Sequence, residues 1–193
     1  MKQWELTAGT RLSAAGAAAP LQNPEHKALR IADLLKRHFL FTFAAAGVIA
    51  ADQALKWAVL NLLPLHEKIN VVPGLLNIVH YRNPGGAFGL FSAQNGFLTA
   101  VIFIGVTIAA LGLIIYLYYR TPADRQLLAA GLALVFGGAV GNLIDRLRFG
   151  NVVDFIDLYA GNYHWPAFNL ADSAITLGMI IFAWHVIFKK MPA

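Results

Sequence analysis

Long apolar segments separated by short polar connections dominate this chain. Four segments approach the length of about 20 mostly apolar residues that an α-helix needs to cross the hydrocarbon core of a membrane. They cover residues 39–60, 96–118, 126–143 and 171–188. The second contains no charged residue, whereas the first carries Asp52 and Lys56 near its far end. The pattern predicts an all-α membrane protein with four transmembrane helices.

Composition supports a membrane protein and excludes several classes of function. Hydrophobic residues make up 58% of the 193 residues and charged residues only 13%, whereas a typical soluble domain has about 25% charged residues. The absence of cysteine excludes disulfides, thiolate metal sites and cysteine nucleophiles. The net charge of +5 is compatible with nucleic-acid binding, but the distribution of the basic residues indicates another origin. We therefore expect no nucleic-acid partner.

The basic residues concentrate on one set of connections between the apolar segments. Of the fifteen Lys and Arg residues, six precede the first segment, two lie between the second and third, and two follow the fourth. By the positive-inside rule, these connections face the cytoplasm. The charge pattern therefore predicts that both termini are cytoplasmic, in agreement with an even number of spans.

The first 36 residues are predicted to be separate from the membrane domain. They include a short, Ala-rich and weakly hydrophobic run at 12–19, which favours a disordered cytoplasmic extension over a signal peptide. Residues 29–37 are predicted to form a short interfacial helix that leads into the membrane. Residues 37–193 then form the four-helix domain, and the sequence assigns no role to residues 1–36.

The two outer connections, about 61–95 and 145–170, are longer than the inner one and are the expected place for function. In the first, Pro73 and Gly74 fit the middle of a type II turn between two β-forming runs, which predicts a hairpin. In the second, residues 152–157 alternate as a strand does. We expect a small sheet resting on the membrane surface.

Polar and ionisable residues are predicted to gather near the outer interface of the membrane, where they are expensive and usually mark function. They are Asp52, Lys56, Asn142, Arg146, Asp154, Asn169 and Asp172. Local structural roles remain open for several of them. Asp52 and Lys56 have the spacing of a helical ion pair, Asn169 and Asp172 that of a helix cap, and Asp154 can be a solvated strand-edge residue.

Two of these acids can together carry out peptide hydrolysis. The chain contains neither an HExxH metal motif nor a GxSxG nucleophile elbow. Asp154 and Asp172, if close, would share one proton, so that one draws a proton from water while the other polarises the carbonyl group. Asn142 and Arg146 could then position a loop or the substrate backbone. We expect no metal and no other cofactor.

Five motifs in order resemble the lipoprotein signal peptidase (signal peptidase II) family: DQALK at 52–56, YRNPGGAFG at 81–89, GNLIDR at 141–146, NVVDFID at 151–157 and FNLADS at 168–173. The resemblance spans about residues 38–189. It implies a multi-pass enzyme of the bacterial inner membrane with four helices, a small extracytoplasmic β-cradle and a surface-lying helix. It also implies a site at the periplasmic face.

The resemblance further assigns roles to individual residues. The family's catalytic pair would fall on Asp154 and Asp172. Its other motif residues would shape the site and hold substrate, and they map to Asp52, Lys56, Asn83, Gly85, Asn142, Arg146 and Asn169. The implied substrate is a diacylglyceryl-modified prolipoprotein, cleaved just before its lipidated cysteine by a monomeric enzyme in contact with membrane lipid.

Two other functions fit parts of the pattern. A small proton-coupled transporter would place its acids near the middle of the bilayer, on broken helices in repeated halves. Here the acids crowd one interface, and the chain shows no internal repeat. A non-catalytic membrane scaffold with a polar rim would tolerate isosteric replacement of its acids.

Overall fold

The computed structural model describes residues 24–85 and 96–188. The chain divides into two units, Met1–Lys36 and Arg37–Ala193. The predicted disorder of residues 1–23 lies outside the described residues. The helices, sheet and site described below belong to the second unit, apart from the beginning of the first helix.

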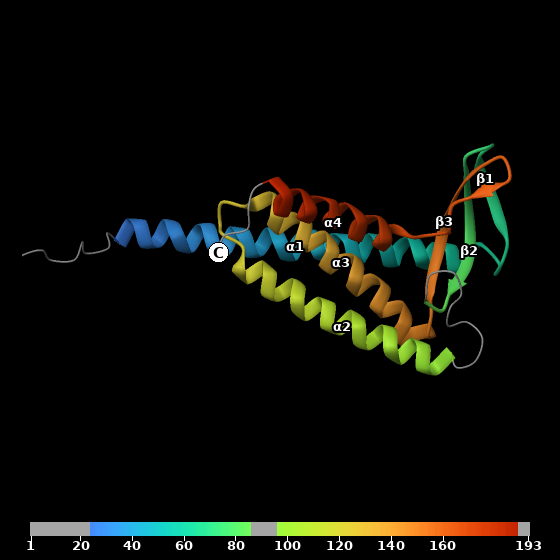
Figure 1. Cartoon of the computed structure of the whole chain (residues 1–193), viewed down its shortest axis with the longest axis horizontal. Helices are drawn as coiled ribbons and strands as arrows, with labels where there is room; N and C mark the ends of the chain where they lie inside the picture. The colour runs from blue at the N-terminus through green and yellow to red at the C-terminus, as the bar shows by residue number, and fades with distance from the viewer. Residues whose placement is uncertain (1–23, 86–95, 189–193) are drawn as a thin grey trace, which may run out of the picture. The chain divides into compact units, whose positions relative to one another are not determined.

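Four helices account for the predicted spans. They are α1 (Pro24–Leu62), α2 (Gly96–Arg120), α3 (Gln126–Phe149) and α4 (Leu170–Phe188). Within the described residues, all four contain a segment long and apolar enough to cross a membrane. The prediction of four transmembrane helices is confirmed (Figure 1).

Two helix boundaries differ from the sequence prediction. Residues 29–37 are not a separate interfacial helix but part of the continuous α1, since no Gly or Pro interrupts residues 25–46. Helix α3 continues beyond Leu143 to Phe149, through residues too polar for a hydropathy count to include. It ends at Gly150, whose left-handed conformation (φ 73°) lets its N–H donate to Arg146 O at 2.9 Å.

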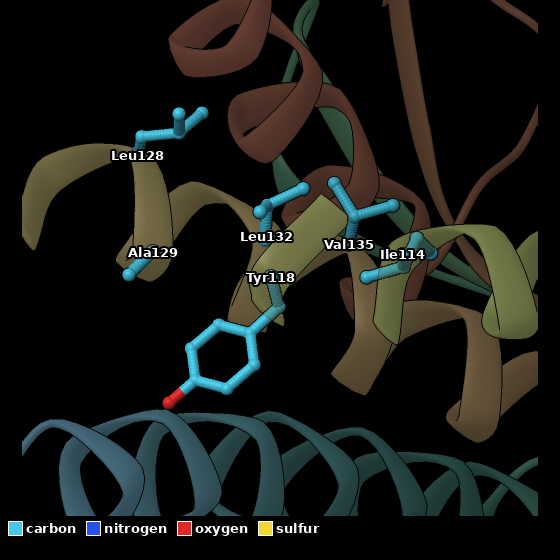
Figure 2. Close-up of a cluster of buried hydrophobic side chains, with 6 residues drawn as sticks. All are labelled: Ile114, Tyr118, Leu128, Ala129, Leu132 and Val135. Carbon is cyan, nitrogen blue, oxygen red and sulfur yellow. The ribbon is translucent and has the colours of Figure 1, made fainter. Parts of the chain in front are cut away.

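Small residues let α3 lie close to its neighbours. A Cβ atom added at Gly137 would lie 2.8 Å from Ala45 O of α1, and one at Gly131 would lie 2.7 Å from the Ile181 side chain of α4. At the end of α2 that leads into α3, an apolar cluster joins the two helices (Figure 2). From it, Tyr118 reaches α1, where its hydroxyl lies 2.8 Å from His38 Nδ1.

The strands form one antiparallel sheet in the order β1-β2-β3-β4. Their bounds are β1 (Lys68–Val72), β2 (Leu76–Asn83), β3 (Val152–Ala160) and β4 (Tyr163–His164). The predicted hairpin is confirmed, with Gly74 in the turn at φ 81°. The described residues contain no helix besides α1–α4, so the expected surface-lying helix is not among them; residues 86–95 lie outside the described part.

A short bridge outside the main ladder brings α4 to the sheet. Phe168 pairs with Ile156 of β3, and Phe168 O accepts hydrogen bonds from the N–H groups of Phe155 and Ile156 at 3.0 and 2.8 Å. Because α4 begins two residues after Phe168, this bridge holds the first turn of α4 beside the middle of β3. The two predicted acids are thereby carried toward each other.

Candidate active site

Asp172 lies in the first turn of α4 and is held by a capping box. Asn169 is the N-cap residue, and its Oδ1 accepts the N–H of Asp172 at 2.9 Å. In return, Asp172 Oδ2 accepts the N–H of Asn169 at 3.1 Å. The cap predicted from the spacing of these residues is therefore present. It fixes the side chain of Asp172 while leaving Oδ1 for other partners.

Asp154 of β3 meets the same asparagine. Asn169 Nδ2 donates to Asp154 Oδ1 at 2.9 Å, so one residue contacts both acids. Asn169 is fully buried, and Asp154 is 3% exposed, whereas Asp172 is half-buried. The structure thus brings the two predicted acids to one buried residue, whose side-chain amide donates to Asp154 and whose backbone N–H donates to Asp172.

Two further amides complete the surroundings of the acid pair. Asn142 of α3 donates from Nδ2 to Asp172 Oδ1 at 2.8 Å. Asn83, at the end of β2, donates from Nδ2 to Asp154 Oδ2 at 2.9 Å. Each carboxyl group therefore accepts two hydrogen bonds from asparagine groups, a pattern that orients both acids closely.

Gly85 is placed beside the pair through Asn83. Its N–H donates to Asn83 Oδ1 at 2.9 Å, which turns the Nδ2 group of Asn83 toward Asp154. Gly85 has φ 97°, and a Cβ atom there would lie 2.6 Å from the Phe103 ring of α2. Both the backbone conformation and the close approach of Phe103 require glycine at this position.

Lys56 and Asp52 are buried in the protein, behind the residues that contact the acid pair. The predicted ion pair is confirmed, with Lys56 Nζ 2.8 Å from Asp52 Oδ2. Lys56 also contacts Asn142 Oδ1 at 2.9 Å and Asp145 Oδ2 at 2.9 Å. Sequence reasoning missed Asp145, although a buried acid three residues from Asn142, on the same helix face, needs a cationic partner.

Arg146 is the predicted site residue with the weakest attachment. Its Nη1 lies 3.4 Å from Asn142 O, and its guanidinium lies 5.4 Å from the centre of the Phe103 ring. Within the described residues, its Nε has no hydrogen-bond partner. Its charge interacts with Asp172, so it lies near the pair without bonding to either acid in the described part.

The surroundings of Asp154 determine its protonation. The pKa of this carboxyl is raised from 3.8 to about 7, mainly by burial and also by the negative charge of Asp172. Hydrogen bonds from Asn83 and Asn169, and the charge of Lys56, lower the pKa but do not offset burial. Asp154 therefore holds a proton through the acidic range and exchanges it near neutral pH.

The arrangement suits acid–base chemistry by two carboxyl groups. Among the described residues, no three His, Cys, Asp or Glu side chains are grouped so that they could hold a metal ion. One acid is buried with a raised pKa, and the other is half-buried and accepts two N–H donors. Such a pair can hold a proton donor and a proton acceptor side by side.

The chain is similar in sequence to known lipoprotein signal peptidases and in fold to a solved bacterial membrane enzyme. A lipoprotein signal peptidase of Desulforapulum autotrophicum is 54% identical over 145 residues, which cover 75% of this chain and 90% of that protein. One from Geobacter metallireducens is 44% identical over 148 residues, covering 77% and 90%. A solved bacterial membrane enzyme, determined by the in meso method at 1.9 Å resolution, is 30% identical with a TM-score of 0.68, covering 78% of this chain and 94% of that one.

The family comparison agrees with these relatives. The profile of the family described as Signal peptidase (SPase) II matches residues 44–188, which include α2, α3, α4, the whole sheet and the acid pair. The match covers well over half of the chain and contains all five motifs noted in the sequence. This chain therefore belongs to the lipoprotein signal peptidase (signal peptidase II) family.

Proposed function

We propose that Asp154 and Asp172 are the catalytic pair of this protein, which is an aspartic signal peptidase that removes signal peptides from prolipoproteins. The observation that carries the assignment is the contact of Asn169 with both carboxyl groups, at 2.9 and 3.1 Å. The two acids are also near enough for the negative charge of Asp172 to raise the pKa of Asp154, as expected of a pair that shares one proton.

The raised pKa of Asp154 suggests how the two acids divide the reaction. Asp172 is the base that takes a proton from water while the water oxygen attacks the scissile carbonyl carbon. Asp154 donates its proton to the carbonyl oxygen, giving a tetrahedral intermediate. When the C–N bond breaks, Asp172 returns its proton to the leaving amine, and the intermediate's hydroxyl group returns a proton to Asp154. Both acids then regain their starting states.

The remaining site residues would support this chemistry. Asn83, Asn142 and Asn169 would keep the carboxyl groups in place, as their hydrogen bonds indicate. Gly85 would let the β2 end approach α2. Arg146, whose guanidinium lies near the pair without bonding to either acid in the described part, would bind a substrate carbonyl group.

We propose diacylglyceryl-modified prolipoproteins as the substrate class, cleaved before the lipidated cysteine. The acid pair lies where α4 begins and meets the sheet, at the end of a membrane-spanning segment. A substrate anchored by an apolar signal helix and two acyl chains would present its scissile bond at that depth. The acid pair and the asparagines that contact it form a site that needs no residue from a second subunit, and we propose a monomeric enzyme.

The proposed orientation places the pair on the periplasmic side of the bacterial inner membrane, with both termini cytoplasmic. Arg120, the last residue of α2, and Arg125, in the connection to α3, lie at the opposite end of α3 from Asn142. By the positive-inside rule, that basic connection faces the cytoplasm. A transporter would be less consistent with this site, because Asp154 lies on β3 and Asp172 in the first turn of α4, rather than in mid-span.

The test uses the purified full chain in detergent and a diacylglyceryl peptide that contains a lipobox. We expect the parent to cleave the peptide immediately before the lipidated cysteine, as read by mass spectrometry. Asp154→Asn and Asp172→Asn should each fold and bind the peptide but fail to cleave it. Asp124→Asn, in the exposed connection between α2 and α3, is the matched control and should cleave normally. Normal cleavage by either variant of the pair would refute the assignment.

A further inference from the structure

A buried ion triad lies directly behind the acid pair. It consists of Lys56, Asp52 and Asp145, which are 2%, 0% and 1% exposed. Lys56 Nζ lies 2.8 Å from Asp52 Oδ2 and 2.9 Å from Asp145 Oδ2. We call these three residues the Lys56 triad.

Each carboxylate of the Lys56 triad holds the backbone next to one acid of the pair. Asp52 Oδ1 accepts the N–H of Ala171 at 3.0 Å, and Ala171 directly precedes Asp172. Asp145 Oδ2 accepts the N–H of Val153 at 3.1 Å, and Val153 directly precedes Asp154. The same lysine therefore connects α1 and α3 to the two backbone positions from which the acids project.

Lys56 makes a third contact that reaches the pair through a side chain. Its Nζ donates to Asn142 Oδ1 at 2.9 Å, which leaves Asn142 Nδ2 to donate to Asp172 Oδ1 at 2.8 Å. An asparagine amide has one oxygen and one nitrogen end, so a cation at the oxygen end decides which end faces Asp172. Asn169 Nδ2 donates to the same oxygen at 3.2 Å, so Lys56 and Asn169 together set the orientation of Asn142.

A contribution to stability alone does not explain why three charged residues are buried together here. Removing three charges from water is costly, and well-packed neutral residues of similar size often stabilise a protein as well or better. The triad also depends on a glycine in α3. A Cβ atom at Gly141 would lie 2.7 Å from Asp52 Oδ2, so a larger residue there would displace this carboxylate. Apart from contacts of both carboxylates with Gln53, the hydrogen bonds of the triad lead to residues beside the acid pair.

We infer that the Lys56 triad is a positioning device that sets the separation of Asp154 and Asp172 by holding the backbone immediately before each of them. The inference rests on the proposed function of that pair. Asp52, Lys56 and Asp145 do not touch substrate; they act through Ala171, Val153 and Asn142. A displacement of about 1 Å in a catalytic geometry can lower a rate by about a hundredfold.

The main test is a neutral version of the triad, Asp52→Asn/Lys56→Met/Asp145→Asn, in the full chain. Because the three charges are removed together and the sizes are kept, this variant is expected to fold with a melting temperature close to the parent's. With the backbone bonds weakened, its kcat for the diacylglyceryl peptide should fall by about a hundredfold, while KM changes by less than about threefold. Lys68→Met, at the exposed start of β1, is the matched control and should keep the parent's kcat.

A folded neutral variant with the parent's kcat would overturn the inference, and so would a loss confined to KM. If the neutral variant does not fold, the single change Asp145→Asn serves instead and should lower kcat by about tenfold at unchanged KM. Failure of both variants to fold would assign the triad to stability alone and overturn the proposal.

Asp154→Asn and Asp172→Asn belong in the same assay, because they separate the two ideas. If both are inactive while the folded neutral variant is fully active, only the positioning role fails. If either of them cleaves normally, the catalytic assignment fails instead.

Discussion

Replacing Asp154 by asparagine is expected to change how the stability of the protein depends on pH. Burial raises the pKa of this carboxyl from 3.8 to about 7 in the folded state. The folded protein therefore binds the proton more tightly than the unfolded chain does. The stabilising contribution is complete below pH 3.8 and is lost as the pH rises through about 7.

The size of this effect follows from the displacement of the pKa. At about 1.4 kcal/mol per pKa unit, a change from 3.8 to about 7 corresponds to about 4 kcal/mol of stability lost above neutral pH. Asparagine cannot ionise, so the variant avoids this loss. It has a cost of its own, about 1–3 kcal/mol at any pH, because its amide nitrogen must face one of the donors Asn83 and Asn169.

The assay is thermal unfolding of the parent and Asp154→Asn in the same detergent, from about pH 4 to about pH 9. The melting temperature of the variant relative to the parent should rise across this range by on the order of 10 °C, most steeply between about pH 5 and about pH 7. Asp124→Asn controls for the loss of one exposed carboxylate. A relative melting temperature that stays constant or falls with pH would refute the reasoning.

Three other substitutions test separate parts of the structure. Gly141→Ala should lower kcat by on the order of tenfold, because its Cβ would lie 2.7 Å from Asp52 Oδ2 and displace that carboxylate; peptide cleavage measures it. Gly85→Ala should lower the free energy of unfolding by about 2–4 kcal/mol, since it combines φ 97° with a 2.6 Å contact to Phe103; thermal unfolding measures it. Asp157→Asn should reduce stability at neutral pH by on the order of 1 kcal/mol but less in acid; unfolding from about pH 3 to about pH 7 measures it.

Each of these predictions has a control or a contrary outcome. Gly112→Ala, where an added Cβ meets no atom within 4 Å, should leave kcat unchanged. Gly150→Ala has a positive φ but open space and should cost less stability than the Gly85 change; equal costs would contradict the contact argument.

The sign for Asp157 follows from its neighbours. Burial raises its pKa, but hydrogen bonds from Asn77 and His164 outweigh burial, so the net pKa is lowered. The stabilisation is therefore present above pH 3.8 and is lost as the pH falls through the lowered value. An Asp157→Asn effect that grows toward acid pH would contradict this account.

Hydropathy alone was sufficient to predict the spans that contain few polar residues. Helix α2, without a charged residue before Arg120, was placed closely by its apolar length. Helix α3 was predicted to end near Leu143 because the polar residues after it resemble a connection. In the folded protein Asp145 is buried against Lys56, so the helix continues to Phe149.

The residues of the acid pair could be named from the sequence, but their contact could not. Asp154 and Asp172 come from a strand and a helix, and those elements are brought together by long-range contacts such as the pairing of Phe168 with Ile156. The ion pair of Asp52 and Lys56 was readable because both lie on one helix, four residues apart. The ion pair of Lys56 and Asp145 joins two helices. The number of residues between them in the sequence does not indicate whether they are in contact.

The measurement that tests the central claim most directly is the pH dependence of kcat/KM for cleavage of the diacylglyceryl peptide. If Asp154 and Asp172 share one proton, activity should rise with pH in the acidic range and fall as the pH passes about 7, when Asp154 loses its proton. A profile that stays level or keeps rising from neutral to alkaline pH would contradict a protonated Asp154 as the acid of the pair.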